Sequence, residues 1–339
     1  MVKELDIEAF LQLNQGYVLL DTRTPAEYEK AHVPGAKNLP LLDNEERAII
    51  GTTYKQKGRE EAILQGFELT GSKWRNFIEK ALELAPDKKI AVYCWRGGMR
   101  SGIMSWILDL YGFKTIKITG GYKSYRNWVL QQFEKEYPII VLGGMTGSHK
   151  TEILTELKKQ GEQTIDLEEL AQHLGSSYGT LNKLVQPSQE QFENLLAKEL
   201  FQLDLNRHIW MEDESRNIGK RTLPEHIFEQ IRAHQLILLD IEKEKRIDFL
   251  VEEYGSLDKE FLIEATERIS KRLGPQHAKN AIEAIKNNDM RQFIETVLTY
   301  YDKTYTRGLS KRNSEMIKKV TICFENPHQC AEEILLKIK

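Results

Sequence analysis

Residues 94–101 of this chain read CWRGGMRS, and residues 144–151 read GMTGSHKT. Each of these glycine-rich stretches follows a short run of apolar, β-branched residues and precedes a segment with helical spacing. A turn that joins a buried strand to a helix is where α/β proteins bind their ligands. The two stretches therefore predict two α/β domains, each with an anion-binding turn at the carboxyl end of a strand.

The first domain is predicted from the elements around the CWRGGMRS stretch. Its three predicted strands lie at residues 18–21, 89–93 and 115–118. A charged and aromatic helix over residues 123–137 ends before Pro138, and we place the domain boundary there. Strands that alternate with helices indicate a parallel α/β sheet, here over residues 1–137, with Cys94 at a strand end.

The second domain covers residues 138–339 and begins with a strand at residues 139–142, followed by a helix at residues 151–160. Its further predicted strands lie at residues 164–165, 209–211, 236–239 and 320–323. From about residue 243 to 312 the pattern is helical and charged. We therefore expect an α/β domain of the P-loop NTPase type with a helical C-terminal region.

The bulk composition is that of a globular protein with room for two domains. Of 339 residues, 40% are hydrophobic and 29% are charged, and the net charge is −3. No apolar stretch is long enough to span a bilayer, and the first residues lack the apolar core of an export signal. Cys94, Cys323 and Cys330 do not make a disulfide framework. We therefore expect a cytoplasmic protein with no membrane partner and a free Cys94 thiol.

Cys94 has the surroundings that a reactive thiol needs. A thiol reacts as its thiolate, which positive charge and backbone N–H groups stabilise. The glycine-rich turn offers such N–H groups at the start of a helix, and Arg96 and Arg100 add positive charge. Five residues separate Cys94 from Arg100, as in cysteine-dependent phosphatases, whereas a usual sulfurtransferase loop has four. We predict that Cys94, Arg96 and Arg100 are catalytic, in a loop wide enough for a tetrahedral oxyanion.

The second stretch is close to the Walker A pattern of phosphate-binding loops. Its backbone N–H groups would hold phosphate oxygens, Lys150 would neutralise the terminal phosphate, and Thr151 would reach a magnesium ion or a phosphate. His149 departs from the pattern, which has glycine at this position. A side chain there would narrow the loop or contact the ligand, which argues against ordinary ATP hydrolysis. The predicted ligand-binding residues of the loop are Gly144, Gly147, Ser148, Lys150 and Thr151.

Two acidic segments follow later strands of the second domain. Residues 212–216 read EDESR and come directly after the strand predicted at residues 209–211. P-loop proteins place at such a position the acid that holds the water shell of a metal ion, and we assign a ligand-binding role to Asp213. Asp166 and Glu168 resemble the acidic pair of small-molecule P-loop kinases, and a solvated helix start explains them equally well. The sequence predicts no metal site built from protein ligands alone.

The order and combination of these motifs resemble tRNA 2-selenouridine synthases over nearly the whole chain. Segments in the order seen in rhodanese domains lie at residues 21–23, 27–28 and 32–36. Further segments similar to the family lie at residues 51–55, 120–123, 175–179, 272–274 and 300–302. Two residues depart from the family pattern: His149 replaces a glycine, and Lys303 stands where the family tends to have proline.

The resemblance implies a rhodanese-like domain fused to a P-loop domain, in an enzyme that modifies tRNA. Its substrate would be tRNA with 2-thiouridine at the wobble position, and selenium from selenophosphate would replace the sulfur. The family is also described as attaching a geranyl group to that sulfur, using geranyl diphosphate. By resemblance, Cys94 would carry selenium as a Cys–Se intermediate. Because of His149, we expect geranyl diphosphate rather than ATP at the P-loop, with Mg²⁺ as an optional companion and a selenophosphate-supplying enzyme as an optional partner.

Binding of tRNA would depend on local surfaces, since the whole chain is slightly acidic. Proteins that read single-stranded RNA stack splayed bases on aromatic rings. Trp95 and Tyr122 are candidate stacking groups near the cysteine loop, although core packing is the favoured role for each. We expect the helical region at residues 243–312 to offer the surface for the anticodon arm.

Two other functions stay open on the residues alone. The length of the cysteine loop allows a cysteine phosphatase fused to a small-molecule P-loop kinase, although the bulky Trp95 and the lack of serine and threonine inside the loop argue against it. A non-enzymatic alternative is a sulfur carrier or tRNA-binding adaptor in which Cys94 only stores a persulfide. Release of phosphate from an aryl phosphate would favour the first, and tRNA binding without any change to the nucleoside would favour the second.

Overall fold

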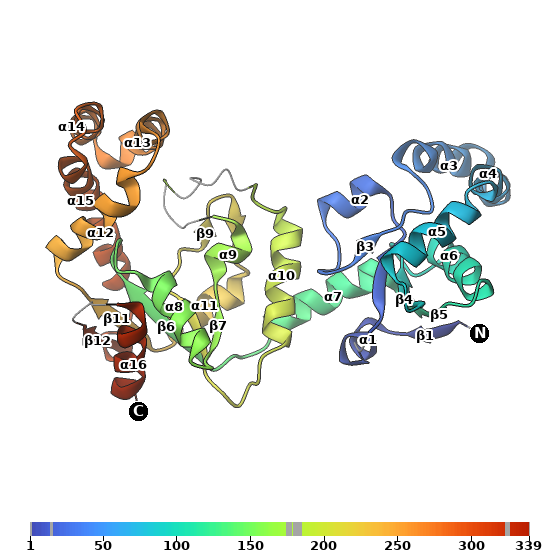
Figure 1. The fold of residues 1–339 in the computed structure, drawn as a ribbon, viewed down its shortest axis with the longest axis horizontal. Helices are drawn as coiled ribbons and strands as arrows, with labels where there is room; N and C mark the ends of the chain where they lie inside the picture. The colour runs from blue at the N-terminus through green and yellow to red at the C-terminus, as the bar shows by residue number, and fades with distance from the viewer. Residues whose placement is uncertain (1, 14–15, 174–177, 179–184, 323–325, 339) are drawn as a thin grey trace. The chain divides into compact units, whose positions relative to one another are not determined.

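The computed structural model describes residues 2–13, 16–173, 178, 185–322 and 326–338. Cys323 and four residues of the 175–179 segment lie outside these ranges. The chain divides into two compact units (Figure 1). Unit 1 comprises Met1–Gln132 and Glu193–Lys198, and unit 2 comprises Phe133–Phe192 and Glu199–Lys339. None of the described helices is both long enough and apolar enough to cross a membrane.

Unit 1 is built, within its described residues, around a five-stranded sheet in which all paired strands are parallel. The strand order is β1-β5-β4-β2-β3. The strands are β1 (Lys3–Leu5), β2 (Val18–Asp21), β3 (Lys37–Asn38), β4 (Lys89–Tyr93) and β5 (Lys114–Ile118). The helices are α1 (Ile7–Leu13), α2 (Pro25–Lys30), α3 (Asn44–Lys57), α4 (Arg59–Gly71), α5 (Trp74–Leu84), α6 (Met99–Leu110) and α7 (Gly121–Phe133). The predicted parallel α/β class of this domain is confirmed.

Local sequence explains where several of these elements begin and end. Thr24 caps α2: its hydroxyl accepts a hydrogen bond from the N–H of Glu27, whose side chain accepts one from the N–H of Thr24. Helix α7 ends four residues before the predicted end at 137. Beyond it, the Gln230 side chain accepts from the Tyr137 N–H and donates to the Lys135 carbonyl. These backbone groups are satisfied by a distant side chain rather than by further helix.

Unit 2 also has a parallel five-stranded sheet in its described residues, with the order β12-β11-β6-β8-β7. Its strands are β6 (Ile139–Gly144), β7 (Gln163–Ile165), β8 (Ile209–Glu212), β11 (Leu236–Asp240) and β12 (Ile317–Thr321). A short antiparallel pair is formed by β9 (Asn217–Ile218) and β10 (Arg221–Thr222). The last strand begins and ends earlier than the predicted 320–323. The prediction was wrong because Lys318 and Lys319, on this edge strand, interrupt the apolar pattern that indicates a strand.

The helices of unit 2 surround this sheet and form a separate helical region. They are α8 (Lys150–Lys159), α9 (Leu167–Ala171), α11 (Glu225–Ala233), α12 (Lys243–Gly255), α13 (Lys259–Leu273), α14 (Pro275–Lys286), α15 (Met290–Leu309), the 3-10 turn η1 (Ser314–Met316) and α16 (Pro327–Ile338). Helix α10 (Gln189–Phe201) is divided, since its residues Glu193–Lys198 belong to unit 1. Helices α12 to α15 are labelled in Figure 1. They share an apolar core that includes Leu262, Ala281 and Phe293. The predicted helical C-terminal region is therefore confirmed.

Candidate functional site

Cys94 is buried, although the turn that follows it between β4 and α6 is mostly exposed. Its sulfur is 3.2 Å from the hydroxyl oxygen of Ser101, in the first turn of α6. The Ser101 hydroxyl donates to the carbonyl oxygen of Gly98, the N-cap residue of this helix, at 3.2 Å. The thiol is thus placed beside the amino end of α6.

A glycine turn after β5 holds the backbone of the cysteine loop. The N–H of Tyr122 donates to the Cys94 carbonyl at 2.8 Å, and the N–H of Lys123 donates to the Trp95 carbonyl at 2.9 Å. Gly121 has φ +57°, and a β-carbon on it would lie 2.2 Å from the Cys94 carbonyl oxygen. Only glycine fits such an approach, so the GGYK segment at residues 120–123 sets the position of the loop.

The two arginines predicted to be catalytic have different surroundings. Arg96 is exposed in the loop. Arg100 is half-buried and donates to the two carboxylate oxygens of Glu27 at 2.6 and 3.4 Å. Burial alone would raise the pKa of Glu27, but the hydrogen bond and charge of Arg100 outweigh it and lower that pKa. Arg100 therefore shares its charge with Glu27, and the catalytic role of both arginines stays a prediction.

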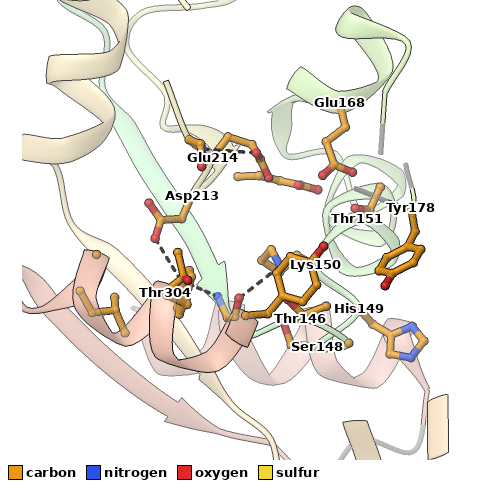
Figure 2. Close-up of a pocket in the computed structure, with 18 of the residues that line it drawn as sticks. Thr146, Ser148, His149, Lys150, Thr151, Glu168, Tyr178, Asp213, Glu214 and Thr304 are labelled. Carbon is orange, nitrogen blue, oxygen red and sulfur yellow. Dashed lines mark hydrogen bonds between the residues drawn. The ribbon is translucent and has the colours of Figure 1, made fainter. Parts of the chain in front are cut away.

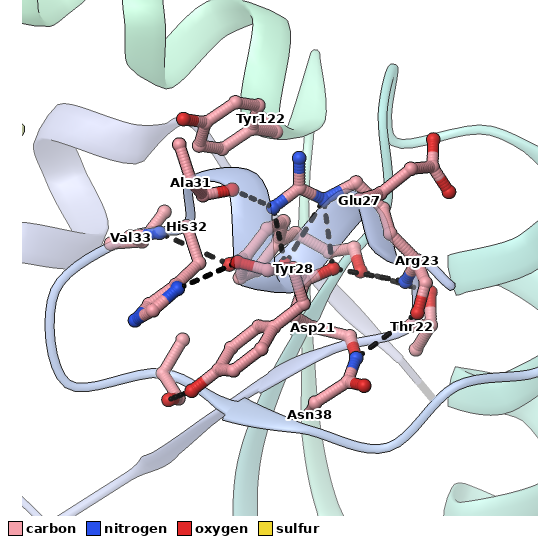
Figure 3. A network of polar contacts seen from close by, with 12 residues as sticks. Asp21, Thr22, Arg23, Glu27, Tyr28, Ala31, His32, Val33, Asn38 and Tyr122 are labelled. Carbon is pink, nitrogen blue, oxygen red and sulfur yellow. Dashed lines mark hydrogen bonds and ion pairs between the residues drawn. The ribbon is translucent and has the colours of Figure 1, made fainter. Parts of the chain in front are cut away.

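Asp21 pairs with Arg23 at the centre of a buried network (Figure 3). Arg23 donates to both carboxylate oxygens of Asp21, at 2.6 to 3.0 Å, and to the Ala31 carbonyl at 2.7 Å. Its guanidinium carbon also lies 3.9 Å from the ring centre of Tyr122. A buried ion pair is tolerated only when its groups are fully hydrogen-bonded. Here Arg23 connects Asp21 of β2 to the Ala31 carbonyl and to the ring of Tyr122, next to the cysteine loop.

The aromatic residues near the loop divide into buried and exposed. Tyr122 is fully buried, which confirms core packing as its role, whereas the Trp95 side chain is 40% exposed. His32 stacks on Tyr28 and lies within hydrogen-bonding distance of its carbonyl, as a structural turn residue does. Trp95 thus stays a candidate for stacking a base.

The P-loop follows β6 and opens α8, as predicted (Figure 2). The Lys150 amino group donates to the Gly144 carbonyl at 3.2 Å. The Ser148 hydroxyl is buried and has no hydrogen-bond partner among the described residues. The loop and the residues facing it enclose a cavity of about 1000 Å³. The structure brings to this cavity all the predicted ligand-binding residues of the second domain: Gly144, Gly147, Ser148, Lys150, Thr151 and Asp213.

His149 has a left-handed backbone, with φ 52° and ψ 36°, which explains why the Walker pattern has glycine here. Its ring meets Phe249 of α12 edge-on, with ring centres 4.3 Å apart, and its Nδ1 is 3.3 Å from a Glu152 carboxylate oxygen. Figure 2 shows the ring turned away from Lys150 and Thr151. His149 is nevertheless among the residues that line the cavity, and the expectation that its side chain narrows the loop or contacts the ligand stays a prediction.

Two residues of α15 and one of α12 hold the P-loop in place. Arg246 is buried; it donates to the Thr146 carbonyl at 3.0 Å and to both carboxylate oxygens of Asp302 at 2.7 and 2.9 Å. The Tyr305 hydroxyl accepts from the Gly144 N–H at 2.9 Å. No local pattern in the sequence assigns a role to these residues. The segment at residues 300–302, which is similar to the family, includes Asp302. The helical region therefore supports the phosphate-binding backbone directly.

Asp213 anchors part of this support. Its carboxylate accepts from Arg312 at 2.5 Å, from Arg232 at 3.2 Å and from the Tyr305 hydroxyl at 3.0 Å. Figure 2 shows it directed away from Glu168 and Glu214. Although Asp213 lines the cavity, its carboxylate is already engaged by two arginines. Its role in binding a ligand stays a prediction, and its observed contacts are structural.

Three other carboxylates gather beside the P-loop instead. Each of Glu168, Glu212 and Glu214 offers an oxygen within 4.8 Å of the other two. Burial, followed by the charges of Glu212 and Glu214, raises the pKa of Glu168 to about 9. Burial also raises the pKa of Glu212 to about 7, although the charge of Lys150 opposes it. Glu168 and residues 212–216 belong to two separate segments of the sequence. Only the pairing of β7 with β8 brings these segments together.

Apolar and aromatic residues also line the cavity, namely Tyr178, Leu250, Tyr254, Tyr300 and Tyr301. The Tyr178 hydroxyl is hydrogen-bonded to Thr266 at 3.0 Å, and the Tyr178 ring packs against Tyr254. Such a lining is suited to an apolar or aromatic group of a ligand.

Comparisons with known proteins agree with this architecture. The family profile described as "tRNA 2-selenouridine synthase AAA domain" matches residues 137–323, and the profile "Rhodanese-like domain" matches residues 7–127. A curated tRNA 2-selenouridine synthase from Sulfurovum sp. is 35% identical over 88% of this chain and 90% of its own length. Those from Nitrosomonas eutropha and Shewanella sediminis are 32% and 33% identical, each over 94% of this chain and 93% or 94% of their own length. This chain belongs to the tRNA 2-selenouridine synthase family.

Proposed function

We propose that this protein modifies the wobble uridine of tRNA, replacing the 2-thio sulfur by selenium from selenophosphate after an S-geranylation step. In the first step, the sulfur attacks C1 of geranyl diphosphate: an S–C bond forms, a C–O bond breaks and pyrophosphate leaves. In the second, a C2–Se bond forms as the C2–S bond breaks and geranylthiol leaves. One chain of this family contains both a loop with a buried thiol and a P-loop cavity lined in part by aromatic residues, and this observation carries the proposal.

The P-loop cavity supports a diphosphate with an apolar group. The Lys150 ammonium and the loop N–H groups suit the phosphates. The wall formed by Tyr178, Leu250, Tyr254, Tyr300 and Tyr301 suits a geranyl chain. Burial of such a chain is favourable by about 0.8 kcal/mol per methylene group. Departure of pyrophosphate would be assisted by the same cationic loop that binds it.

The cysteine loop supports the selenium step. Its glycine-rich backbone and helix amino end suit an oxyanion such as selenophosphate next to the Cys94 sulfur. The Cys94 thiolate would attack phosphorus, so that an S–P bond forms, the P–Se bond breaks and selenide leaves to attack C2 of the nucleoside; water would then release phosphate from Cys94. Arg96 and Arg100 would bind the oxyanion. A selenophosphate-supplying enzyme is the partner that this step requires. Because tRNA is the substrate, we place the reaction in the cytoplasm.

Mass spectrometry of nucleosides from 2-thiouridine tRNA tests the proposal. With geranyl diphosphate alone, we expect S-geranyl-2-thiouridine, and on addition of selenophosphate we expect 2-selenouridine. Lys150→Ala should stop the first step, and Cys94→Ser should stop the second. An unchanged 2-thiouridine peak with folded, tRNA-bound protein would contradict the proposal and favour an adaptor. Release of phosphate from an aryl phosphate would favour the phosphatase function.

A further inference from the structure

Trp95 is exposed, although it directly follows the buried Cys94. Its fractional exposure is 40%, whereas the neighbouring aromatic residues Tyr93 and Tyr122 are 1% and 0% exposed. Large aromatic rings contribute to stability mainly when they are buried. Core packing therefore accounts for only part of this side chain, and a ligand that covers the ring would account for the rest.

The Trp95 ring is supported by the buried network of Figure 3, which includes Arg23 and Tyr122. The ring centres of Trp95 and Tyr122 are 5.7 Å apart. The guanidinium carbon of Arg23, which is held by Asp21, lies 5.9 Å from the Trp95 ring centre. The Trp95 carbonyl accepts a hydrogen bond from the Lys123 N–H at 2.9 Å, so the backbone is held as well. A ring that is already oriented loses little conformational freedom when a ligand stacks on it, which favours binding.

The surroundings of Trp95 are positively charged, although the net charge of the whole chain is −3. Residues 94–108 and 119–133, which include the cysteine loop and α7, contain no acidic residue. Their basic residues are Arg96, Arg100, Lys123 and Arg126. Arg100 and Arg126 form ion pairs with glutamates of unit 1. The other two are exposed and have no ion pair among the residues that the structure describes, as suits a surface that binds phosphate.

We propose that Trp95 stacks on the wobble base of the substrate tRNA and that Lys123 binds a phosphate next to that base. An oriented aromatic ring beside unpaired positive charge is the combination with which proteins hold single-stranded RNA. The inference rests on the proposed function, in which C2 of the wobble nucleoside must reach the selenide released at Cys94. Trp95 is then a positioning residue: it holds the base beside the sulfur and takes no part in the bonds that form or break.

Binding of an anticodon stem-loop RNA to the full chain tests the stacking contact without any chemistry. Two fluorescently labelled RNAs would be compared by anisotropy, in the absence of selenophosphate and geranyl diphosphate. One has 2-thiouridine at the wobble position, and the other lacks the base there. We expect the wild type to bind the first RNA at least about fivefold more tightly, as the loss of one stacked base predicts. Trp95→Ala should bind both RNAs equally, and Trp95→Phe should keep most of the preference.

Lys123→Ala tests the phosphate contact separately. It should weaken binding of both RNAs by the same factor, and the slope of log affinity against log salt concentration should fall by about one. Lys114→Ala is its control and should change neither quantity. Lys114 is also exposed, but it begins β5 and lies at the end of the parallel sheet opposite to the end that Cys94 follows.

Trp106→Ala is the matched control for Trp95→Ala. Trp106 is also exposed, but it lies about two turns into α6 and packs against Trp74, so its variant should keep the wild-type preference. Failure of the wild type to bind either RNA, or an equal preference in the wild type and Trp95→Ala, would overturn the inference. A preference that depends on Trp95, without formation of 2-selenouridine in full tRNA, would support the inference and contradict the proposed reaction instead.

Discussion

The hydroxyl of Tyr305 lies 2.9 Å from the backbone nitrogen of Gly144 and accepts its hydrogen bond, although the two residues are 161 positions apart. The same hydroxyl donates to Asp213 at 3.0 Å. Burial and the charge of Asp213 raise the pKa of Tyr305 well above its usual value, so the phenol keeps its proton for this bond. The end of the long helix α15 is thereby joined to the first residue of the P-loop.

Tyr305→Phe should destabilise unit 2 and weaken diphosphate binding. The change leaves the buried Gly144 N–H without its acceptor, which costs about 1–3 kcal/mol. Urea unfolding and calorimetric titration with geranyl diphosphate would measure the two effects. Tyr54→Phe is the control, since Tyr54 is exposed on α3 and does not line the cavity. Equal behaviour of the two variants would show that the Tyr305 hydroxyl does not support the loop.

Cys94→Ser should abolish formation of 2-selenouridine while leaving S-geranylation intact, because the two steps use different residues. Nucleoside mass spectrometry after each co-substrate would separate them. Cys330→Ser is the control: Cys330 is buried in α16, and burial raises the pKa of its thiol to about 11, so it should be unreactive. Selenium transfer that survives in Cys94→Ser would remove Cys94 from the mechanism.

Ser101→Ala should slow the selenium step. The Ser101 hydroxyl lies 3.2 Å from the Cys94 sulfur and 3.2 Å from the Gly98 carbonyl oxygen, so its loss removes a contact that positions the sulfur in the loop. Formation of 2-selenouridine, followed by nucleoside mass spectrometry, should slow by about tenfold, as the loss of one hydrogen bond does, while S-geranylation is unchanged. Ser101→Thr keeps the hydroxyl and should restore the rate. An unchanged rate in Ser101→Ala would show that the contact does not serve the reaction.

His149→Gly should retain diphosphate binding within about threefold, because the imidazole packs on Phe249 instead of entering the loop. Relief of the left-handed backbone should offset, by about 1–2 kcal/mol, the loss of the contacts to Phe249 and Glu152. Lys150→Ala should lose binding altogether, and calorimetric titration of both variants with geranyl diphosphate would compare them. A large loss of affinity in His149→Gly would show that the ring contacts the ligand.

Glu168→Gln should change how the free energy of unfolding depends on pH. The pKa of Glu168 is raised from 4.5 to about 9, so the native state binds a proton that the unfolded state has lost. That contribution is fully present below about pH 4.5 and is lost as pH rises through about 9. The variant has no proton to lose at this position. From pH 5 to pH 9, its free energy of unfolding should therefore rise relative to that of the wild type. Parallel urea-unfolding curves at pH 5, 7 and 9 would refute a raised pKa.

Some elements were predictable from the sequence because local pattern alone specifies them. The runs at residues 18–21 and 89–93 are apolar and short, and the structure has strands with those same bounds. Thr24 and Pro25 mark the start of α2 by capping chemistry that needs no distant partner. Residues at helix ends and sheet edges were less predictable. Helix α7 ends early because the Gln230 side chain hydrogen-bonds the backbone beyond it, and the lysines of β12 interrupt the apolar pattern of an edge strand.

The sequence by itself determined the two anion-binding turns, the α/β class and the family, because turn chemistry and strand–helix alternation are encoded within short stretches. Only the tertiary structure decided which carboxylates face the P-loop. Asp213 and Glu214 are adjacent in the chain, yet one meets Arg312 and the other meets Glu168, because neighbouring residues leaving a strand point in different directions. Likewise, only packing placed Tyr305 and Arg246 on the loop, since hydrogen bonds across more than a hundred residues leave no local pattern.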